Sequence, residues 1–270
     1  MTAERRGPAW HALQRFLDNR SATVATVVLA LLVLMAALAP LLARTGPGDQ
    51  AFLEQAFAFP SGQHWFGVDP LGRDFYSRVV YGARVSLGIG LVSALVSLAI
   101  GLPLGSLAGF VGGKTDWLIM RLVELFSVVP PLLLAIILAS LLGGGVVNVV
   151  LISSGFLWVH TCRLVRGQVM ATKNREFIAA SRALGASDWY VLRRHLVPNS
   201  VSPIIVGFVL AIPQAMMIEA SLSFLGVGIN PPTPSWGQMI NKGLEYMFYY
   251  WHLGLFPTLF LAVTVLATTL

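Results

Sequence analysis

The sequence predicts an all-α protein, a polytopic helix bundle that crosses a membrane six times. Of the 270 residues, 56% are hydrophobic and only 11% are charged, whereas about 25% of the residues in a soluble domain are charged. A helix needs about 20 apolar residues to cross the hydrocarbon core of a bilayer. Runs of this kind occupy residues 23–43, 85–108, 117–142, 146–170, 203–225 and 253–270.

The first run follows a basic N-terminal tail at 1–22, which contains Arg5, Arg6, Arg15 and Arg20. A secretory signal has a similar charge pattern, but its apolar core is only 7 to 15 residues long. We therefore expect an uncleaved first helix. Glycine and proline recur inside the later runs, which membrane helices tolerate when they pack against one another, so residues 23–270 are predicted to form one transmembrane domain.

Two longer connections, 45–83 and 226–252, contain turn residues. Gly67, Pro70 and Gly72 mark turns in the first connection, and a second helix is expected to begin early, after Asp74. The prolines of the second connection exclude regular helix and favour a rigid, extended loop; these are Pro231, Pro232 and Pro234.

The distribution of lysine and arginine predicts the orientation. Seven of these residues fall between 163 and 194, whereas 227–252 contains only Lys242. Because cytoplasmic loops carry the excess of positive charge, both termini and the segment 171–200 are predicted to be cytoplasmic, and 45–83 and 226–252 extracytoplasmic. The net charge of +6 follows from this bias and needs no nucleic-acid partner.

The cytoplasmic segment has its own pattern between residues 176 and 199. Phe177, Ala180, Ser181 and Leu184 recur at helical spacing and form one apolar or small-residue face. Gly185 is predicted to end this helix. Ser187 and Asp188 then start a second helix, because a hydroxyl caps free amides and a carboxylate suits the helix N-terminus. The second helix is expected to end before Pro198, which gives a helix pair suited to binding another protein.

The chemical motifs of an enzyme are not found. The stretch GFVGGKT at 109–115 fails the P-loop spacing by one residue and joins two apolar helices rather than a strand and a helix. The histidines are scattered, and His160 and Cys162 fall on different faces of a helix, so no metal site is predicted. The chain is expected to be non-catalytic and to bind no cofactor itself.

Two carboxylates lie inside apolar runs. Glu124 is predicted to be structural and to pair with Arg121 or reach the membrane interface. Glu219 is deeper, where a charge costs about 2.5–3.5 kcal/mol on insertion scales, so it is expected to face protein or water. Two interpretations stay open: Glu219 hydrogen-bonds a neighbouring helix, or Glu219 and Ser223 lie on a substrate pathway.

Three blocks together resemble one family. They read GVDPLGRD followed by SRVVYGARVSLGIG (67–90), AASRALGASDWYVLRRHLVPN (179–199) and EASLSFLGVGINPPTPSWGQM (219–239). They are similar to the inner-membrane permeases of bacterial ABC importers for dipeptides, oligopeptides and nickel, specifically the C-type subunit. The resemblance covers nearly the whole chain and implies the type I ABC importer permease fold.

The resemblance implies half of a translocation pathway for peptides in a bacterial inner membrane. The implied partners are a homologous permease, two cytosolic ATPase subunits or one fused ATPase, an extracytoplasmic substrate-binding protein and the lipid bilayer; ATP and Mg would bind to the ATPases. Nickel chelates or glutathione are the alternative substrates. A secondary transporter driven by an ion gradient is the rival class, and it would need intramembrane relays or an inverted repeat.

The resemblance also implies which residues couple the permease to the ATPase: Phe177, Ala180, Ser181, Arg182, Leu184, Gly185, Ser187, Asp188, Trp189 and Leu192. Gly185 and Pro198 match the family pattern of this segment. Ala179 stands where a glutamate is usual, and His195 stands where an isoleucine is usual, so the salt bridge of that glutamate is not expected here. The family pattern further predicts a short charged tail beyond Leu270.

Overall fold

The computed structural model describes residues 18–270, and the prediction for residues 1–17 lies outside this part of the chain. Within it the architecture is all-α, as predicted, with no strand and a single isolated bridge between Val68 and Asp74. The helices run in the order α2 (Arg20–Ala37), α3 (Ala39–Leu42), η1 (Leu53–Gln55), α4 (Phe75–Val111), α5 (Gly113–Val128), α6 (Pro131–Leu142), α7 (Val146–Lys173), α8 (Glu176–Ala183), α9 (Asp188–Val191), η2 (Leu192–Leu196), α10 (Val197–Asn199), α11 (Val201–Phe224), α12 (Trp236–Glu245) and α13 (His252–Thr269).

Five of the described helices are long and apolar enough to cross a membrane, and the pair α5 and α6 makes six if it counts as one span. The prediction of a single third helix is wrong, because α5 and α6 meet at an angle of 82°. Pro130 and Pro131 explain the bend: proline forces the residue before it out of the helical region, and Val129 has φ −84° and ψ 132°. The first run is likewise interrupted, at Leu38, where Pro40 begins a separate turn.

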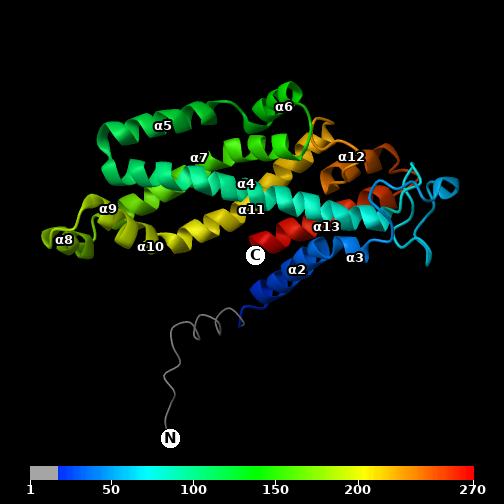
Figure 1. Cartoon of the computed structure of the whole chain (residues 1–270), viewed down its shortest axis with the longest axis horizontal. Helices are drawn as coiled ribbons and strands as arrows, with labels where there is room; N and C mark the ends of the chain where they lie inside the picture. Colours follow the sequence, from blue (N-terminus) through cyan, green and yellow to red (C-terminus); the bar gives the residue numbers. More distant parts are fainter. Residues whose placement is uncertain (1–17) are drawn as a thin grey trace, which may run out of the picture.

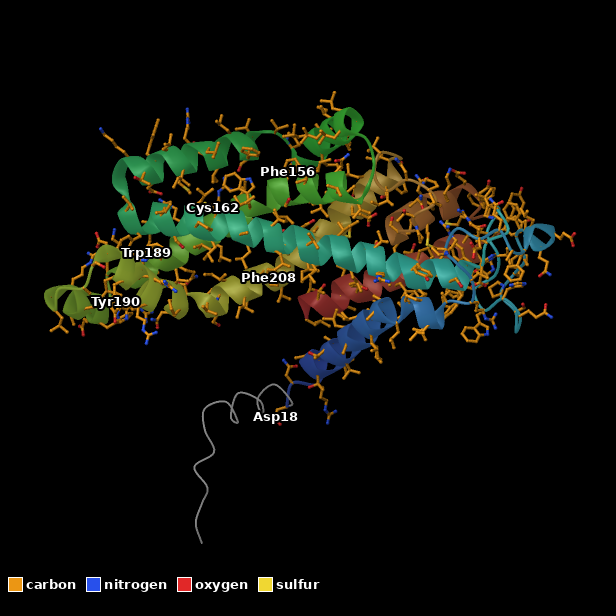
Figure 2. All side chains as sticks on the ribbon, viewed as in Figure 1. Asp18, Phe156, Cys162, Trp189, Tyr190 and Phe208 are labelled. Atoms are coloured by element: carbon orange, nitrogen blue, oxygen red, sulfur yellow. The ribbon has the colours of Figure 1, made fainter. Side chains whose placement is uncertain are left out.

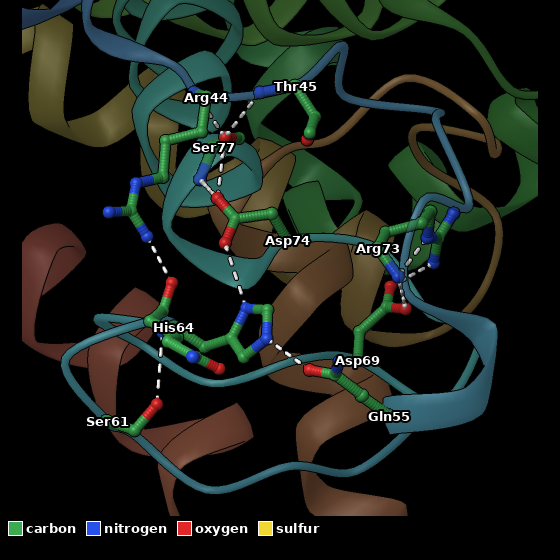
Figure 3. Close-up of polar contacts among 10 residues, drawn as sticks. Arg44, Thr45, Gln55, Ser61, His64, Asp69, Arg73, Asp74 and Ser77 are labelled. Atoms are coloured by element: carbon green, nitrogen blue, oxygen red, sulfur yellow. Dashed lines mark hydrogen bonds and ion pairs between the residues drawn. The ribbon is translucent and has the colours of Figure 1, made fainter.

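The longest helix, α4, begins early, as predicted. Asp74 caps it: Oδ2 accepts from the amide of Ser77 at 2.9 Å. Figure 3 shows how the preceding chain joins this cap, with the amides of Arg44 and Thr45 donating to Ser77 Oγ. With 37 residues, α4 is about 55 Å long at 1.5 Å per residue. It therefore extends well beyond a hydrocarbon core of about 30 Å.

The helices α4, α7 and α11 form the centre of the bundle (Figure 1). A glycine stripe on α4 lets α7 approach closely: a Cβ at Gly101 would lie 2.7 Å from Thr161, and a Cβ at Gly105 would lie 2.5 Å from the carbonyl oxygen of Cys162. Small residues at such contacts allow membrane helices to pack through their backbones. Ser97 and Thr161 add a hydrogen bond of 2.9 Å across the same interface.

The elongated bundle has two different ends (Figure 1). We call the end formed by residues 174–200 the α8 end; it contains α8, α9 and α10 and lies at the left of the figure. We call the other the loop end; it is formed by residues 43–74 and 225–251 and lies at the right.

Candidate functional site

The helix pair predicted at 176–199 is present, and a tight turn at Gly185 joins its two parts. Gly185 has φ +85°, a conformation that glycine adopts without strain. Its amide donates to the carbonyl of Arg182 at 2.9 Å, and the amide of Ala186 donates to that of Ser181 at 3.1 Å. This pair of bonds is the Schellman motif that ends helices in a defined direction, so the angle between α8 and α9 is fixed locally.

The second helix starts at the predicted cap. Ser187 Oγ accepts from the amide of Tyr190 at 3.3 Å, and Asp188 lies in the first turn. The prediction that this helix ends before Pro198 is wrong, because α9 continues through the π turn η2 into α10, which contains Pro198. A proline ring clashes with the carbonyl four residues earlier in an α-helix, and the wider π turn relieves that contact.

Buried side chains anchor the segment to the long helices. Ile178, Val191 and Leu196 are each at most 1% exposed and pack with Phe110 and with apolar residues of α7 and α11. Leu192 belongs to the same cluster and is 7% exposed. Its prediction as a contact for a partner is therefore wrong, since it faces the chain's own core.

Other predicted residues are free to meet a partner. Leu184 is 90% exposed, Trp189 is 67% exposed, and Phe177 is exposed as well. Tyr190, which was not among the predicted residues, is also exposed. Figure 2 labels Trp189 and Tyr190 at the α8 end. Ala180 is exposed beside Leu184, and Ser181 is half-buried. Exposed apolar side chains gathered on one small surface are typical of protein contacts.

The charges of the segment are partly satisfied within the chain. The guanidinium of Arg182 lies 3.2 Å from Asp188 Oδ1 and also stands over the ring of Phe110. Arg182 thus links the two halves of the helix pair across the Gly185 turn. Among residues 18–270, Arg193 and Arg194 form no ion pair, and both lie at the exposed surface beside Trp189.

The buried carboxylate of Glu219 lies at the opposite half of the bundle. It is 0% exposed, and it accepts hydrogen bonds from Ser223 Oγ at 2.8 Å and from Ser86 Oγ at 3.3 Å. Ser86 also accepts from the amide of Trp236, and Ser223 from that of Ile229. The carboxylate therefore ties α11 to α4 and, through these serines, to the chain around α12.

The remaining candidates take local roles. Glu124 Oε2 lies 3.2 Å from Arg121 on an exposed face of α5, the pairing that the sequence predicted. The stretch 109–115 forms the turn from α4 into α5, helix to helix. Within the described range 18–270, no group of three metal-binding side chains occurs.

A bundle of this kind, with five or six spans apolar and long enough to cross a membrane and a fixed helix pair at one end, is the architecture of a multi-pass membrane protein. The chain belongs to the family of inner-membrane components of binding-protein-dependent transport systems, whose model matches residues 101–270. The model for the N-terminal transmembrane domain of oligopeptide transport permease C matches residues 7–60. The resemblance to C-type permeases of ABC importers is therefore confirmed.

Relatives match over nearly the whole chain. The oligopeptide transport system permease OppC of Bacillus subtilis is 40% identical over 255 residues, which cover 94% of this chain and 83% of the relative. The dipeptide transport system permease DppC of the same organism is 39% identical, with coverages of 96% and 80%. The glutathione transport system permease GsiD of Pectobacterium atrosepticum is 40% identical, with coverages of 95% and 85%.

Proposed function

We propose that this chain forms half of the translocation pathway of an ATP-driven peptide importer and that its α8 end docks onto an ATPase subunit. The observation that carries the proposal is the helix pair around Gly185. It is rigidly anchored on one side by Ile178, Val191 and Leu196, and it presents Leu184 and Trp189 on the other. A surface of this kind suits a cleft on a partner protein.

We expect the α8 end to lie in the cytosol, with both termini on that side, because the lysine and arginine bias favours that orientation. The loop end then faces outward, where a substrate-binding protein would deliver its ligand, and a homologous permease would complete the pathway. ATP and Mg would be held by the ATPase subunits, which leaves this chain a non-catalytic role.

The mechanism follows from connectivity. α8 follows α7 directly, and α10 leads into α11, so a push on the Gly185 turn is passed to two of the three central helices. The anchor in the core makes the segment move with those helices instead of sliding over them. Closure of the ATPase pair would thereby tilt α7 and α11 and switch the bundle between inward-open and outward-open states.

The test is Gly185→Val in the reconstituted complex. Because a β-branched side chain is disfavoured at φ +85°, the turn should deform and uncouple the ATPase. Substrate-stimulated ATP hydrolysis should fall at least tenfold, while substrate capture by the binding protein is unchanged. Gly143→Val is the matched control: Gly143 has φ +80° and, like Gly185, has open space where a Cβ would lie, but it stands between α6 and α7.

A second variant tests the exposed apolar surface independently of the turn at Gly185. Leu184→Ser leaves the backbone and the core unchanged, yet it removes the most exposed apolar side chain of the segment. It should weaken co-purification of the ATPase with little change in the stability of the permease. Unchanged coupling in both variants would overturn the assignment of this segment, and transport by the chain alone in liposomes would favour a secondary transporter.

Glutathione is the second candidate substrate, because a relative named for glutathione transport is as similar to the chain as the oligopeptide permease. Glutathione and oligopeptides are both short molecules with amide groups. Uptake of a mixture of two- to five-residue peptides that includes glutathione, read by mass spectrometry, would distinguish them. A nickel chelate is tested by the same proteoliposomes with nickel and a histidine-containing peptide.

A further inference from the structure

A groove of about 480 Å³ lies between four helices of the bundle and is lined by no residue of the α8 end. α6, α7, α11 and α13 line it. Its walls are largely apolar and include Pro131, Phe156, Pro213 and Met217. Figure 2 labels Phe156 on α7, near the bend between α5 and α6. No lysine, arginine, aspartate or glutamate lines the groove.

Two polar side chains open into this groove. His160 lies at the centre of α7, and Gln214 lies at the centre of α11. Both are exposed, although the helices that carry them are long and apolar enough to cross a membrane. Centres of spans lie near the midplane of a bilayer, so the two side chains come from matching depths.

Neither side chain has a polar partner in the part of the chain that the structure describes. Among residues 18–270, no hydrogen bond or ion pair is made by His160 or Gln214, whereas Thr269 at the same groove bonds its own helix at Val265. An unpaired amide or imidazole in hydrocarbon costs several kcal/mol on alkane scales. These side chains therefore face water or hydrogen-bonding groups rather than lipid tails.

Glu219 and Ser223 behave differently. Both are buried, bonded to each other and absent from the groove lining. Their polar groups are already used to join helices, so in this conformation they offer nothing to a passing molecule. His160 and Gln214, by contrast, are exposed and line the groove, so their polar groups remain available at mid-depth.

We infer that His160 and Gln214 form a contact site for the main-chain amides of a translocated short peptide, an inference that rests on the proposed function. The Gln214 amide carries two donors and one acceptor, and a neutral imidazole carries one of each, so together they match the N–H and C=O groups that every peptide has. Methionine and aromatic walls adapt to varied apolar shapes. The lining carries no fixed charge, so a charged side chain of the peptide would find no opposite charge there. This fits recognition of the peptide backbone rather than of its side chains.

The other possible occupant is a helix of the sister permease. An apolar membrane helix has its backbone amides bonded internally, so it would cover His160 and Gln214 without pairing them. A peptide in extended form has free amides that pair with both. The chemistry of the groove thus favours the peptide.

The test uses the complete complex in proteoliposomes with the mixed peptide library, and it compares His160→Leu and Gln214→Leu with wild type. Each substitution removes about one hydrogen bond to the substrate, so uptake should fall about 5- to 10-fold. Co-purification of the partners and ATP hydrolysis stimulated by the binding protein should stay within about twofold of wild type. His160→Gln keeps a neutral donor and acceptor and should restore uptake to within about twofold.

Ser221→Ala is the matched control. Ser221 is half-buried on α11, the helix that carries Gln214. It lies outside this groove, and its hydroxyl donates to the carbonyl of Met217, so uptake should not change. Wild-type uptake in both leucine variants would overturn the inference. Loss of the sister permease from the purified complex would also overturn it, because the groove would then be a subunit interface. A wild-type complex that takes up no peptide would instead defeat the proposed function itself.

Discussion

The two ends of the bundle are held together by different forces. At the loop end, Asp69 is almost fully buried and accepts from the amides of Leu71 and Arg73, while its other oxygen meets the guanidiniums of Arg73 at 2.6 Å and Arg78 at 3.5 Å. At the α8 end, the contacts with the long helices are mainly apolar and centre on Ile178, Val191 and Leu196. The loop end is therefore fixed by directional bonds, and the α8 end by contacts that have no preferred direction.

Arg78 shows how far the polar network reaches. Besides Asp69, it donates to the carbonyl of Pro47 at 2.7 Å and to Gln238 Oε1 at 3.4 Å. One side chain thus joins α4, the chain before it and α12. Any shift between these parts would break several hydrogen bonds at once, so the loop end suits a fixed platform.

The α8 end suits a moving part. Apolar contacts in a cluster can shift slightly without losing a specific partner, and the two halves of the segment are held together by the Gly185 turn and the pair Arg182–Asp188. The segment can therefore move as one unit relative to its surroundings. The comparison teaches that directional polar bonds and apolar anchoring are divided between opposite ends of the bundle.

Asp69→Ala should have the largest effect on stability. It removes one partner of a buried ion pair and leaves the Arg78 guanidinium, 4% exposed, without its carboxylate, which costs about 3–5 kcal/mol. Thermal or detergent-induced unfolding of the purified chain measures the loss. Glu124→Ala is the matched control: it breaks an exposed pair with Arg121, worth at most about 1 kcal/mol. Equal losses in the two variants would contradict the account of the loop end.

Gly67 and Gly185 permit a sharper comparison, because their φ angles are +84° and +85°. At either position an alanine would have to adopt a positive φ, which costs about 1–2 kcal/mol. At Gly67 a Cβ would also lie 2.5 Å from the carbonyl oxygen of Ala58 and 2.7 Å from the ring of His252, whereas at Gly185 nothing lies within 4 Å. Overpacking adds about 1–3 kcal/mol.

Gly67→Ala should therefore lower the free energy of unfolding by about 3 kcal/mol, and Gly185→Ala by only about 1 kcal/mol. The same unfolding measurement serves for both. Equal losses of stability in the two variants would show that close packing around Gly67 does not make the loop end more sensitive to substitution than the α8 end.

The helices were predictable from sequence because they depend on local features. Apolar run lengths located the spans, Asp74 marked the start of α4, and Ser187 marked the start of α9. Two adjacent prolines, Pro130 and Pro131, also indicated the bend between α5 and α6. The length of the apolar run around them nevertheless predicted one continuous helix.

Contacts between distant residues were not predictable. Leu192 follows Trp189 at helical spacing, and only the packing of Phe110, Val165 and Ile204 around it shows that it faces inward. The pairing of Arg78 with Gln238 joins positions 160 residues apart. His160 and Gln214 likewise became a candidate pair only when α7 and α11 were placed side by side.

Ser235→Ala and Ser187→Ala should give the smallest effects on stability. Each serine caps a short helix: Ser235 accepts from the amide of Gln238 at 3.1 Å and is 0% exposed, whereas Ser187 accepts from that of Tyr190 at 3.3 Å and is exposed. Loss of a cap costs about 1 kcal/mol, and the cost rises where water cannot replace the lost bond. Hydrogen exchange should therefore quicken in α12 more than in α9, and for Ser187→Ala only in α9. If Ser187→Ala also quickened exchange in α7 and α11, the α8 end would depend on its cap as well as on its apolar anchor. Directional bonds would then hold both ends of the bundle, contrary to the comparison above.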